Sequence, residues 1–129
     1  MTKSEAVTHG VRIEVESTYV PEQSNPVAQE WFFAYRIKIT NQSSDSVQLV
    51  SRHWTITDAN GRTEEVKGAG VVGKQPRLGP GETFEYESFC PLRTSFGTMH
   101  GTYHMVPQGS DEFDAEIPPF ALGMPHSIN

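Results

Sequence analysis

Apolar and polar residues alternate one by one through much of this sequence. Val11, Ile13 and Val15 alternate with charged residues, and residues 33–40 continue with the same period. The pattern also occupies residues 84–87, 99–105 and 113–117. Successive side chains of a strand point to opposite faces of a sheet, so a period of two predicts strands with one buried face. No segment shows a convincing helical period.

The strand expected at residues 47–58 changes phase within its own length. Leu49 and Trp54 are both apolar but would fall on opposite faces of a regular strand, which fits a β-bulge or a strand covered on both sides. The segment ends close to Asn60-Gly61, a pair that tolerates the positive φ angles of a tight turn. We therefore expect residues 62–67 to return antiparallel to it.

Strands at such short intervals predict an all-β fold, an immunoglobulin- or fibronectin type III-like antiparallel β-sandwich of about seven to eight strands. The single cysteine excludes an intrachain disulfide and favours the fibronectin-like version. We expect one domain over residues 1–129, with a core at about 11–122 and flexible ends at 1–9 and 123–129. The last strand should end at Pro118-Pro119, because proline has no N–H to donate.

Charge and hydropathy limit the partners. The net charge of −6 argues against non-specific nucleic-acid binding, because phosphate contacts need a basic surface. The first ten residues contain no apolar stretch like that of a signal peptide, and the longest hydrophobic run, residues 31–35, is far too short to span a membrane. We therefore expect a soluble cytoplasmic protein that binds neither nucleic acid nor membranes. No cofactor is indicated.

A glycine-rich segment matches the pattern G-x-G-x-x-G through Gly68, Gly70 and Gly73. In dinucleotide-binding folds this pattern brings a helix N-terminus to a pyrophosphate. Two prolines and two glycines in the next eight residues exclude that helix, so a Rossmann fold is rejected. Two interpretations remain. The segment is either a small-anion site with Lys74 and Arg77, or a flexible connection between strands.

Residues that often carry catalysis or bind metals lack the spacing that either role requires. On a strand, His100 and His104 lie about 13 Å apart, too far to share one ion. No base can be assigned beside Cys90, which we expect to be a buried small apolar residue. Residues 111–116 form an acidic segment, expected to be a solvated edge, with weak divalent-cation binding as the alternative. We predict no catalytic residue and no metal site.

The adjacent pair Arg52 and His53 is a candidate for partner recognition. Trp54 is expected in the core, as a buried Trp often is in β-sandwiches. His53 would then point to the opposite face, where an exposed cationic and aromatic surface with Arg52 suits protein binding.

Four segments together resemble the bacterial ApaG family. They are Arg52-His53-Trp54-x-Ile56-x-Asp58, Val66-x-Gly68-x-Gly70-Val71-Val72-Gly73-x-Gln75-Pro76, Leu78-x-Pro80-Gly81-Glu82-x-Phe84-x-Tyr86 and Gly97-x-Met99-x-Gly101-x-Tyr103. The resemblance extends from about Val11 to Leu122. The ordered combination is specific, although each fragment alone is not.

The resemblance implies a fibronectin type III-like sandwich. The family takes its name from genetic association with a diadenosine tetraphosphate hydrolase and has been linked to tolerance of cobalt and magnesium. Related domains in some eukaryotic F-box proteins and in a DNA-polymerase-interacting protein look like protein-interaction modules. The family's glycine motif, considered a candidate pyrophosphate-binding site, corresponds to Gly68, Gly70 and Gly73.

Two functions are therefore expected. The first is a non-enzymatic domain that binds a protein partner and is associated with divalent-cation tolerance. The second is binding or sensing of pyrophosphate or nucleotide phosphate through residues 68–77. A small phosphate-containing ligand belongs to the second function alone.

Overall fold

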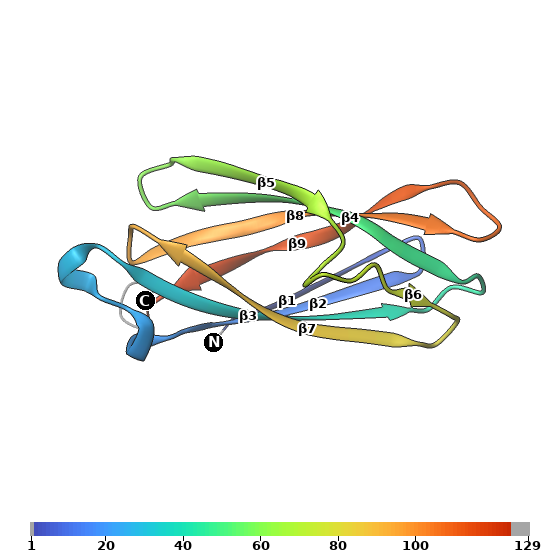
Figure 1. Cartoon of the computed structure of the whole chain (residues 1–129), viewed down its shortest axis with the longest axis horizontal. Helices are drawn as coiled ribbons and strands as arrows, with labels where there is room; N and C mark the ends of the chain where they lie inside the picture. The colour runs from blue at the N-terminus through green and yellow to red at the C-terminus, as the bar shows by residue number, and fades with distance from the viewer. Residues whose placement is uncertain (1, 125–129) are drawn as a thin grey trace.

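A computed structural model describes residues 2–124, which form a sandwich of two antiparallel sheets (Figure 1). The first sheet has the order β1-β2-β3-β7, made of β1 (Thr2–Thr8), β2 (Val11–Tyr19), β3 (Trp31–Asn41) and β7 (Thr83–Leu92). The second has the order β5-β4-β8-β9, made of β5 (Thr63–Ala69), β4 (Val47–Asp58), β8 (Phe96–Pro107) and β9 (Phe113–Gly123), with β6 (Arg77–Leu78) beside β4.

The expected all-β antiparallel sandwich is confirmed, with nine strands in residues 2–124 instead of seven to eight. The described residues contain no α-helix. Two short 3₁₀ helices, η1 (Pro21–Gln23) and η2 (Pro26–Ala28), occupy the connection between β2 and β3. Each begins with a proline, whose fixed φ suits the first helical position.

The phase change in β4 is a β-bulge. The register of β4 against β8 shifts between Leu49 and Ser51, so one extra residue lies on β4. Because the bulge restores the phase, Leu49 and Trp54 both face the core and are 2% and 3% exposed. The hairpin to β5 is also confirmed. Gly61 has a φ of 82°, and β5 returns antiparallel to β4.

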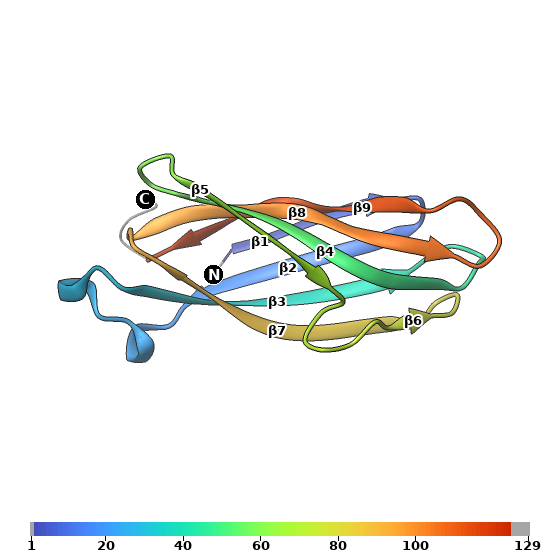
Figure 2. The same cartoon turned by 45° about the horizontal axis from the view of Figure 1, so that its top comes forward.

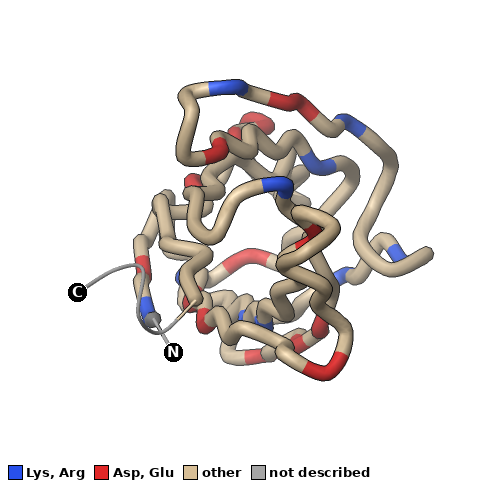
Figure 3. Tube along the Cα trace, turned by 90° about the vertical axis from the view of Figure 1, so that its left-hand side faces the viewer, with Lys and Arg blue, Asp and Glu red and all other residues tan. Residues whose placement is uncertain are grey.

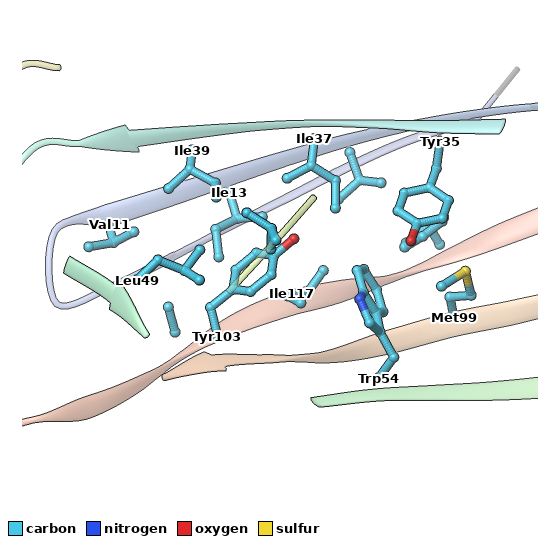
Figure 4. Packing of buried hydrophobic residues seen from close by; sticks show 14 of the residues in the cluster. Val11, Ile13, Tyr35, Ile37, Ile39, Leu49, Trp54, Met99, Tyr103 and Ile117 are labelled. Carbon is cyan, nitrogen blue, oxygen red and sulfur yellow. The ribbon is translucent and has the colours of Figure 1, made fainter. Parts of the chain in front are cut away.

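The core lies between the two sheets (Figure 4). Ile37 and Ile39 project from β3, while Trp54 and Tyr103 project toward them from β4 and β8. The Trp54 ring meets Tyr103, Phe120 and Tyr35 edge-on, at centroid distances of 6.2, 5.9 and 5.5 Å. Edge-to-face contacts of this kind are favourable beyond the area they bury. The expected core position of Trp54 is therefore confirmed.

The N-terminal segment, expected to be flexible, is instead strand β1. It pairs with β2 from Thr2↔Ser17 to Thr8↔Val11. Ion pairs across this edge join Lys3 to Glu16 and Arg12 to Glu5. Residues 2–8 show no alternation of apolar and polar side chains, because an edge strand with mostly polar residues relies on backbone pairing. Of the C-terminal end expected to be flexible, residue 123 belongs to β9 and residues 125–129 lie outside the described residues.

The expected end of the last strand at Pro118-Pro119 is also wrong. β9 continues to Gly123, and Phe120 and Leu122 are buried. The prolines fall where the register between β8 and β9 shifts, between Met99 and Gly101. Proline is tolerated at a bulge and on an edge strand, because neither position requires its missing N–H for the ladder.

The two flanks of the sandwich differ. In Figure 1, β9 lies beside β1 and β2 in the middle of the view, whereas β5 and β7 lie at its upper and lower edges. Where β1 and β2 meet β9, the Glu116 N–H donates to Thr8 Oγ1 at 3.0 Å, and Ser17 Oγ donates to the Ala121 carbonyl at 2.5 Å. We call this side the closed flank. On the opposite side, the open flank, the connection after β5 crosses from one layer toward β7 (Figure 2).

Charged residues of both signs are interspersed around the two layers (Figure 3). In the sequence, acidic residues outnumber basic ones, and most of the basic residues lie in the middle of the chain. Within residues 2–124, no helix is long and apolar enough to cross a membrane.

Candidate functional site at the open flank

A hollow of about 520 Å³ opens between the two sheets at the open flank. Its walls come from the inner faces of β4 and β5, from β7, and from the loop that follows β5. The deep wall is aromatic and carries Tyr35, Trp54 and Tyr86. This volume is in the range typical of ligand sites, and the lining combines aromatic and aliphatic side chains with the polar groups of Arg52, Glu64 and Ser88.

Two exposed hydrophobic side chains lie at the rim of the hollow. Phe89, on β7, is 51% exposed, and Val72, in the loop after β5, is 53% exposed. Phe89 stacks on Phe32 with 5.4 Å between ring centroids. Large apolar side chains that stay exposed beside an apolar hollow are typical of interaction sites.

A second hollow of about 640 Å³ adjoins the first and shares Ile56, Glu64 and Pro91 with it. It extends toward Trp31 and Phe32 at the start of β3. Together the two hollows run along the open flank between β5 and β7. We call them the flank groove.

Arg52 forms part of the groove wall and holds the loop after β5. Its Nη1 donates to the carbonyls of Ala69 and Gly70, at 3.0 and 2.9 Å. Gly68 lies opposite Arg52 in the β4–β5 register, and a Cβ there would approach the guanidinium to 3.0 Å. The missing side chain of Gly68 therefore makes room for the Arg52 side chain to cross β5.

The other two glycines of the G-x-G-x-x-G motif build a tight turn. Val71 and Lys74 exchange two backbone hydrogen bonds of 2.8 Å, and Val72 and Gly73 between them have φ angles of 43° and 78°. Two consecutive positive φ angles are the mark of a type I′ turn. Gly70 has a φ of 64°, and a Cβ there would lie 2.2 Å from the Lys74 carbonyl oxygen. Only glycine fits that position.

The backbone N–H groups of this loop are largely engaged within the protein. Gly70 donates to the Val50 carbonyl, and Val71 and Lys74 donate to each other's carbonyl oxygens. The Arg77 guanidinium donates to Gln48 Oε1 at 3.1 Å. Of the five residues predicted for anion binding, only Gly73 lines the 520 Å³ hollow. The structure therefore brings the motif to the rim of the groove, with Lys74 and Arg77 outside its lining.

The structure separates the two residues predicted for partner recognition. Arg52 shares the inner face of β4 with Trp54 and lines the groove. His53 points to the outer face, where its Nε2 lies 2.7 Å from Glu65 Oε1. Alternation along a strand places neighbours on opposite faces, so the pair does not form one surface.

Burial governs the titratable groups on the inner wall. Desolvation raises the pKa of Tyr86 and of Tyr103, whose hydroxyl groups are hydrogen-bonded to each other. Burial, with a smaller contribution from the Glu64 charge, raises the pKa of Cys90 to about 12. The thiol is therefore protonated at neutral pH. A thiol kept in this form is a poor nucleophile.

Sequence reasoning missed Glu64, which lies on β5 and lines both hollows. It falls on the same face of β5 as Val66, two residues away, and this face looks into the groove. The signal was present in the sequence, because any strand that turns Val66 inward turns Glu64 inward as well.

The acidic segment before and within β9 contacts His104. The two ring nitrogens of His104 lie 2.9 Å from Asp114 Oδ1 and 2.7 Å from Glu112 Oε1. These hydrogen bonds, first that to Asp114, raise the pKa of His104. The carboxylates engage different edges of one ring and do not converge on a shared point. Across residues 2–124, no three His, Cys, Asp or Glu side chains are grouped so that they could hold a metal ion.

The fold and the groove define this chain as a two-sheet antiparallel β-sandwich with a groove between the sheets at one flank. The sequence model of the ApaG domain matches residues 21–107. The chain belongs to the ApaG family, which confirms the sequence resemblance.

Individual relatives cover nearly the whole chain. Protein ApaG of Anaeromyxobacter dehalogenans (strain 2CP-C) is 53% identical over 126 residues, which cover 98% of this chain and 99% of that protein. Protein ApaG of Methylobacterium sp. (strain 4-46) is 53% identical over 121 residues, 94% of this chain and 93% of that protein. The crystal structure of an ApaA protein from Bordetella pertussis has a TM-score of 0.87 at 52% identity, and covers 91% of this chain and 95% of that chain.

Proposed function

We propose that this chain is a non-enzymatic module that binds another protein through the flank groove. The observation that carries the proposal is an apolar groove between two strand edges, β5 and β7, neither of which pairs with a second strand on its groove side in the described structure. Unpaired strand edges and exposed aromatic side chains are features by which proteins recognise peptides.

The chemistry of the groove supports a binding role over a catalytic one. Its most nucleophilic atom, the Cys90 sulfur, belongs to a thiol whose raised pKa keeps it protonated. No histidine lines either hollow within the part of the chain that the structure describes, and burial, together with the Glu64 charge, raises the pKa of the thiol instead of activating it. Apolar walls with a few polar groups suit a partner's side chains better than they suit acyl or phosphoryl transfer.

The test compares two exposed phenylalanines. Phe89→Ser changes the rim of the groove, and Phe96→Ser changes a similarly exposed side chain outside both hollows. Each variant and the wild-type chain are used to isolate bound proteins from the native host at near-physiological salt. We expect a partner that binds the wild-type chain and the Phe96→Ser variant but not the Phe89→Ser variant. Equal recovery by both variants would contradict a role for the groove.

The second candidate function is phosphate binding through residues 68–77. One observation favours it. The N–H groups of Val72 and Gly73, at the tip of the turn, have no acceptor in the described residues and lie next to Lys74. Backbone N–H groups beside a cation can bind a phosphate. The test is titration of the ¹⁵N-labelled chain with pyrophosphate, ATP and diadenosine tetraphosphate. Unmoved amide signals of Gly68, Gly70 and Gly73 at millimolar ligand would reject this function.

A contribution to divalent-cation tolerance would then be indirect. Glu112 and Asp114 face His104 and not each other, which gives a divalent ion no converging set of oxygens. We attribute any such phenotype to the bound partner. Calorimetry with cobalt and magnesium tests this, because heat of binding above dilution would contradict it.

A further inference from the structure

β5 offers a free edge along the mouth of the groove. It pairs with β4 on one side, through Ser51↔Ala69 to Thr57↔Thr63, and is the last strand of its sheet. A strand added beside an edge lies about 4.8 Å away. An added strand would therefore extend the β5-β4-β8-β9 sheet across the mouth of the 520 Å³ hollow.

The two faces of β5 differ in what they offer such a strand. Glu64 and Val66 line the groove, whereas Glu65 lies on the outer face and contacts His53. Side chains of an added strand would meet those of β5 in cross-strand pairs. On the groove side, these pairs involve Glu64 and, two residues further along, Val66.

Charge distinguishes Glu64 from the other charged side chain in the hollow. The Arg52 guanidinium already donates to two carbonyl oxygens. The Glu64 carboxylate forms no ion pair or hydrogen bond with residues 2–124 that would compensate it, and its charge acts on the neighbouring Cys90 thiol. A partner can therefore gain an opposite-charge pair here without displacing an existing one.

We infer that the groove binds an extended segment of the partner that pairs with β5, placing a lysine or arginine against Glu64 and a large apolar side chain beside Val66. This inference rests on the proposed protein-binding function and names the kind of segment that is bound. Main-chain hydrogen bonds to an edge strand supply affinity, and alternate side chains in pockets supply specificity. The recognised pattern is a basic and an apolar residue two positions apart.

The probe is a short acetylated and amidated peptide of serine and threonine that carries lysine and phenylalanine two positions apart. It is titrated into the full ¹⁵N-labelled chain. We expect shifts of the amide signals of β5 and of Phe89 and Cys90 across the groove. A peptide with lysine and phenylalanine adjacent presents them on opposite faces and should bind more weakly, and replacement of lysine by glutamate should weaken binding about fivefold.

Two variants of β5 give matched controls. Glu64→Lys should reverse the preference, so that the glutamate peptide binds more tightly than the lysine peptide. Glu65→Lys makes the same charge change on the outer face of the same strand and should leave the preference for lysine. Both positions are exposed, and circular dichroism confirms that the variants fold.

Several results would overturn the inference. These are peptide-induced shifts outside the groove, an unchanged preference in Glu64→Lys, or an equal change in Glu65→Lys. The amide signals of β5 could also shift with protein concentration in the absence of peptide, together with a dimer in sedimentation. In that case a second copy of the chain, and not a partner segment, would occupy the groove. If no peptide binds while Phe89-dependent recovery of a protein persists, the inference fails and the proposed function stands. If both are absent, both fail.

Discussion

The two flanks of this sandwich differ in the contacts that join one sheet to the other. At the closed flank, β9 lies against β1 and β2, and Thr8 and Ser17 each form a hydrogen bond from one sheet to the other. The His9 and Phe113 rings also meet there, with 4.9 Å between centroids. At the open flank, one loop held by Arg52 spans the gap, and the aromatic interior is partly accessible.

This difference separates stability from recognition. A side chain at the closed flank completes the core, so its loss leaves a cavity in close-packed surroundings. A side chain at the rim of the open flank already meets solvent, so its loss changes what can bind more than how well the chain folds. The same kind of substitution should therefore have different consequences on the two sides.

The largest effect is expected for Phe120→Ala. Phe120 lies on β9, is 4% exposed, and contacts Trp54 and Tyr35. Its truncation should lower the free energy of unfolding by about 3–5 kcal/mol. Phe89→Ala, the same change at the open flank, should cost less than about 1 kcal/mol. Urea denaturation measures both. Similar losses would contradict the distinction between the flanks.

The next effect concerns the loop that covers the open flank. Gly70→Ala would place a Cβ 2.2 Å from the Lys74 carbonyl oxygen at a positive φ. We expect a loss of about 2–3 kcal/mol in thermal or urea unfolding. Gly73→Ala is the control, because it has a similar φ but no atom within 4 Å of the new Cβ. It should cost only about 1 kcal/mol. Equal losses of unfolding free energy in the two variants would mean that the Lys74 carbonyl moves away from the new Cβ with little strain, which would contradict the prediction.

A smaller and more local effect is expected for Arg52→Met. The variant loses two hydrogen bonds from a charged donor, which corresponds to about 1–2 kcal/mol. Hydrogen exchange should accelerate at Gly70, Val71 and Lys74 more than at the amides of β9. Arg77→Met, which removes a contact to Gln48 on the surface, serves as the control and should leave these rates nearly unchanged. Uniform acceleration across both flanks would contradict a local role.

The smallest effect is a pH dependence in the hairpin that leads into β9. Asp114 and Glu112 raise the folded-state pKa of His104 above its ordinary value of 6.5. The protonated ring therefore stabilises the folded state below pH 6.5, and this contribution is lost as the pH rises through the folded-state pKa. Because the groups are exposed, we expect less than about 1 kcal/mol. The advantage of the wild-type chain over His104→Gln should disappear at alkaline pH, and an advantage that grows with pH would contradict the assignment.

Much of the fold was predictable because each buried strand repeats its pattern independently. The change of phase between Leu49 and Trp54 even indicated the bulge in β4. β1 was missed because it buries few apolar side chains. Its pairing with β2 depends on backbone hydrogen bonds, which do not require particular residue types. The continuation of β9 past Pro118-Pro119 depends on a bulge that places these two residues of β9 opposite one residue of β8, and this relation appears only when the two strands are paired.

The candidate site was less predictable, because it arises where segments distant in sequence meet. Gly68, Gly70 and Gly73 were recognised as a motif, but the reason for each glycine involves Arg52, Lys74 or the turn geometry. The groove itself requires β7 to lie across from β5, a relation between sheets that no local pattern contains.

Cys90 gives the open flank a built-in chemical reporter. It is the chain's single cysteine, is 3% exposed, and lies in the wall of the 520 Å³ hollow. Alkylating reagents react with the thiolate. Modification therefore requires an opening of the flank that exposes the Cys90 thiol to solvent and returns its pKa to the ordinary range. The rate of alkylation in the native protein therefore measures how often the two sheets part on this side, and a partner seated in the groove would slow it.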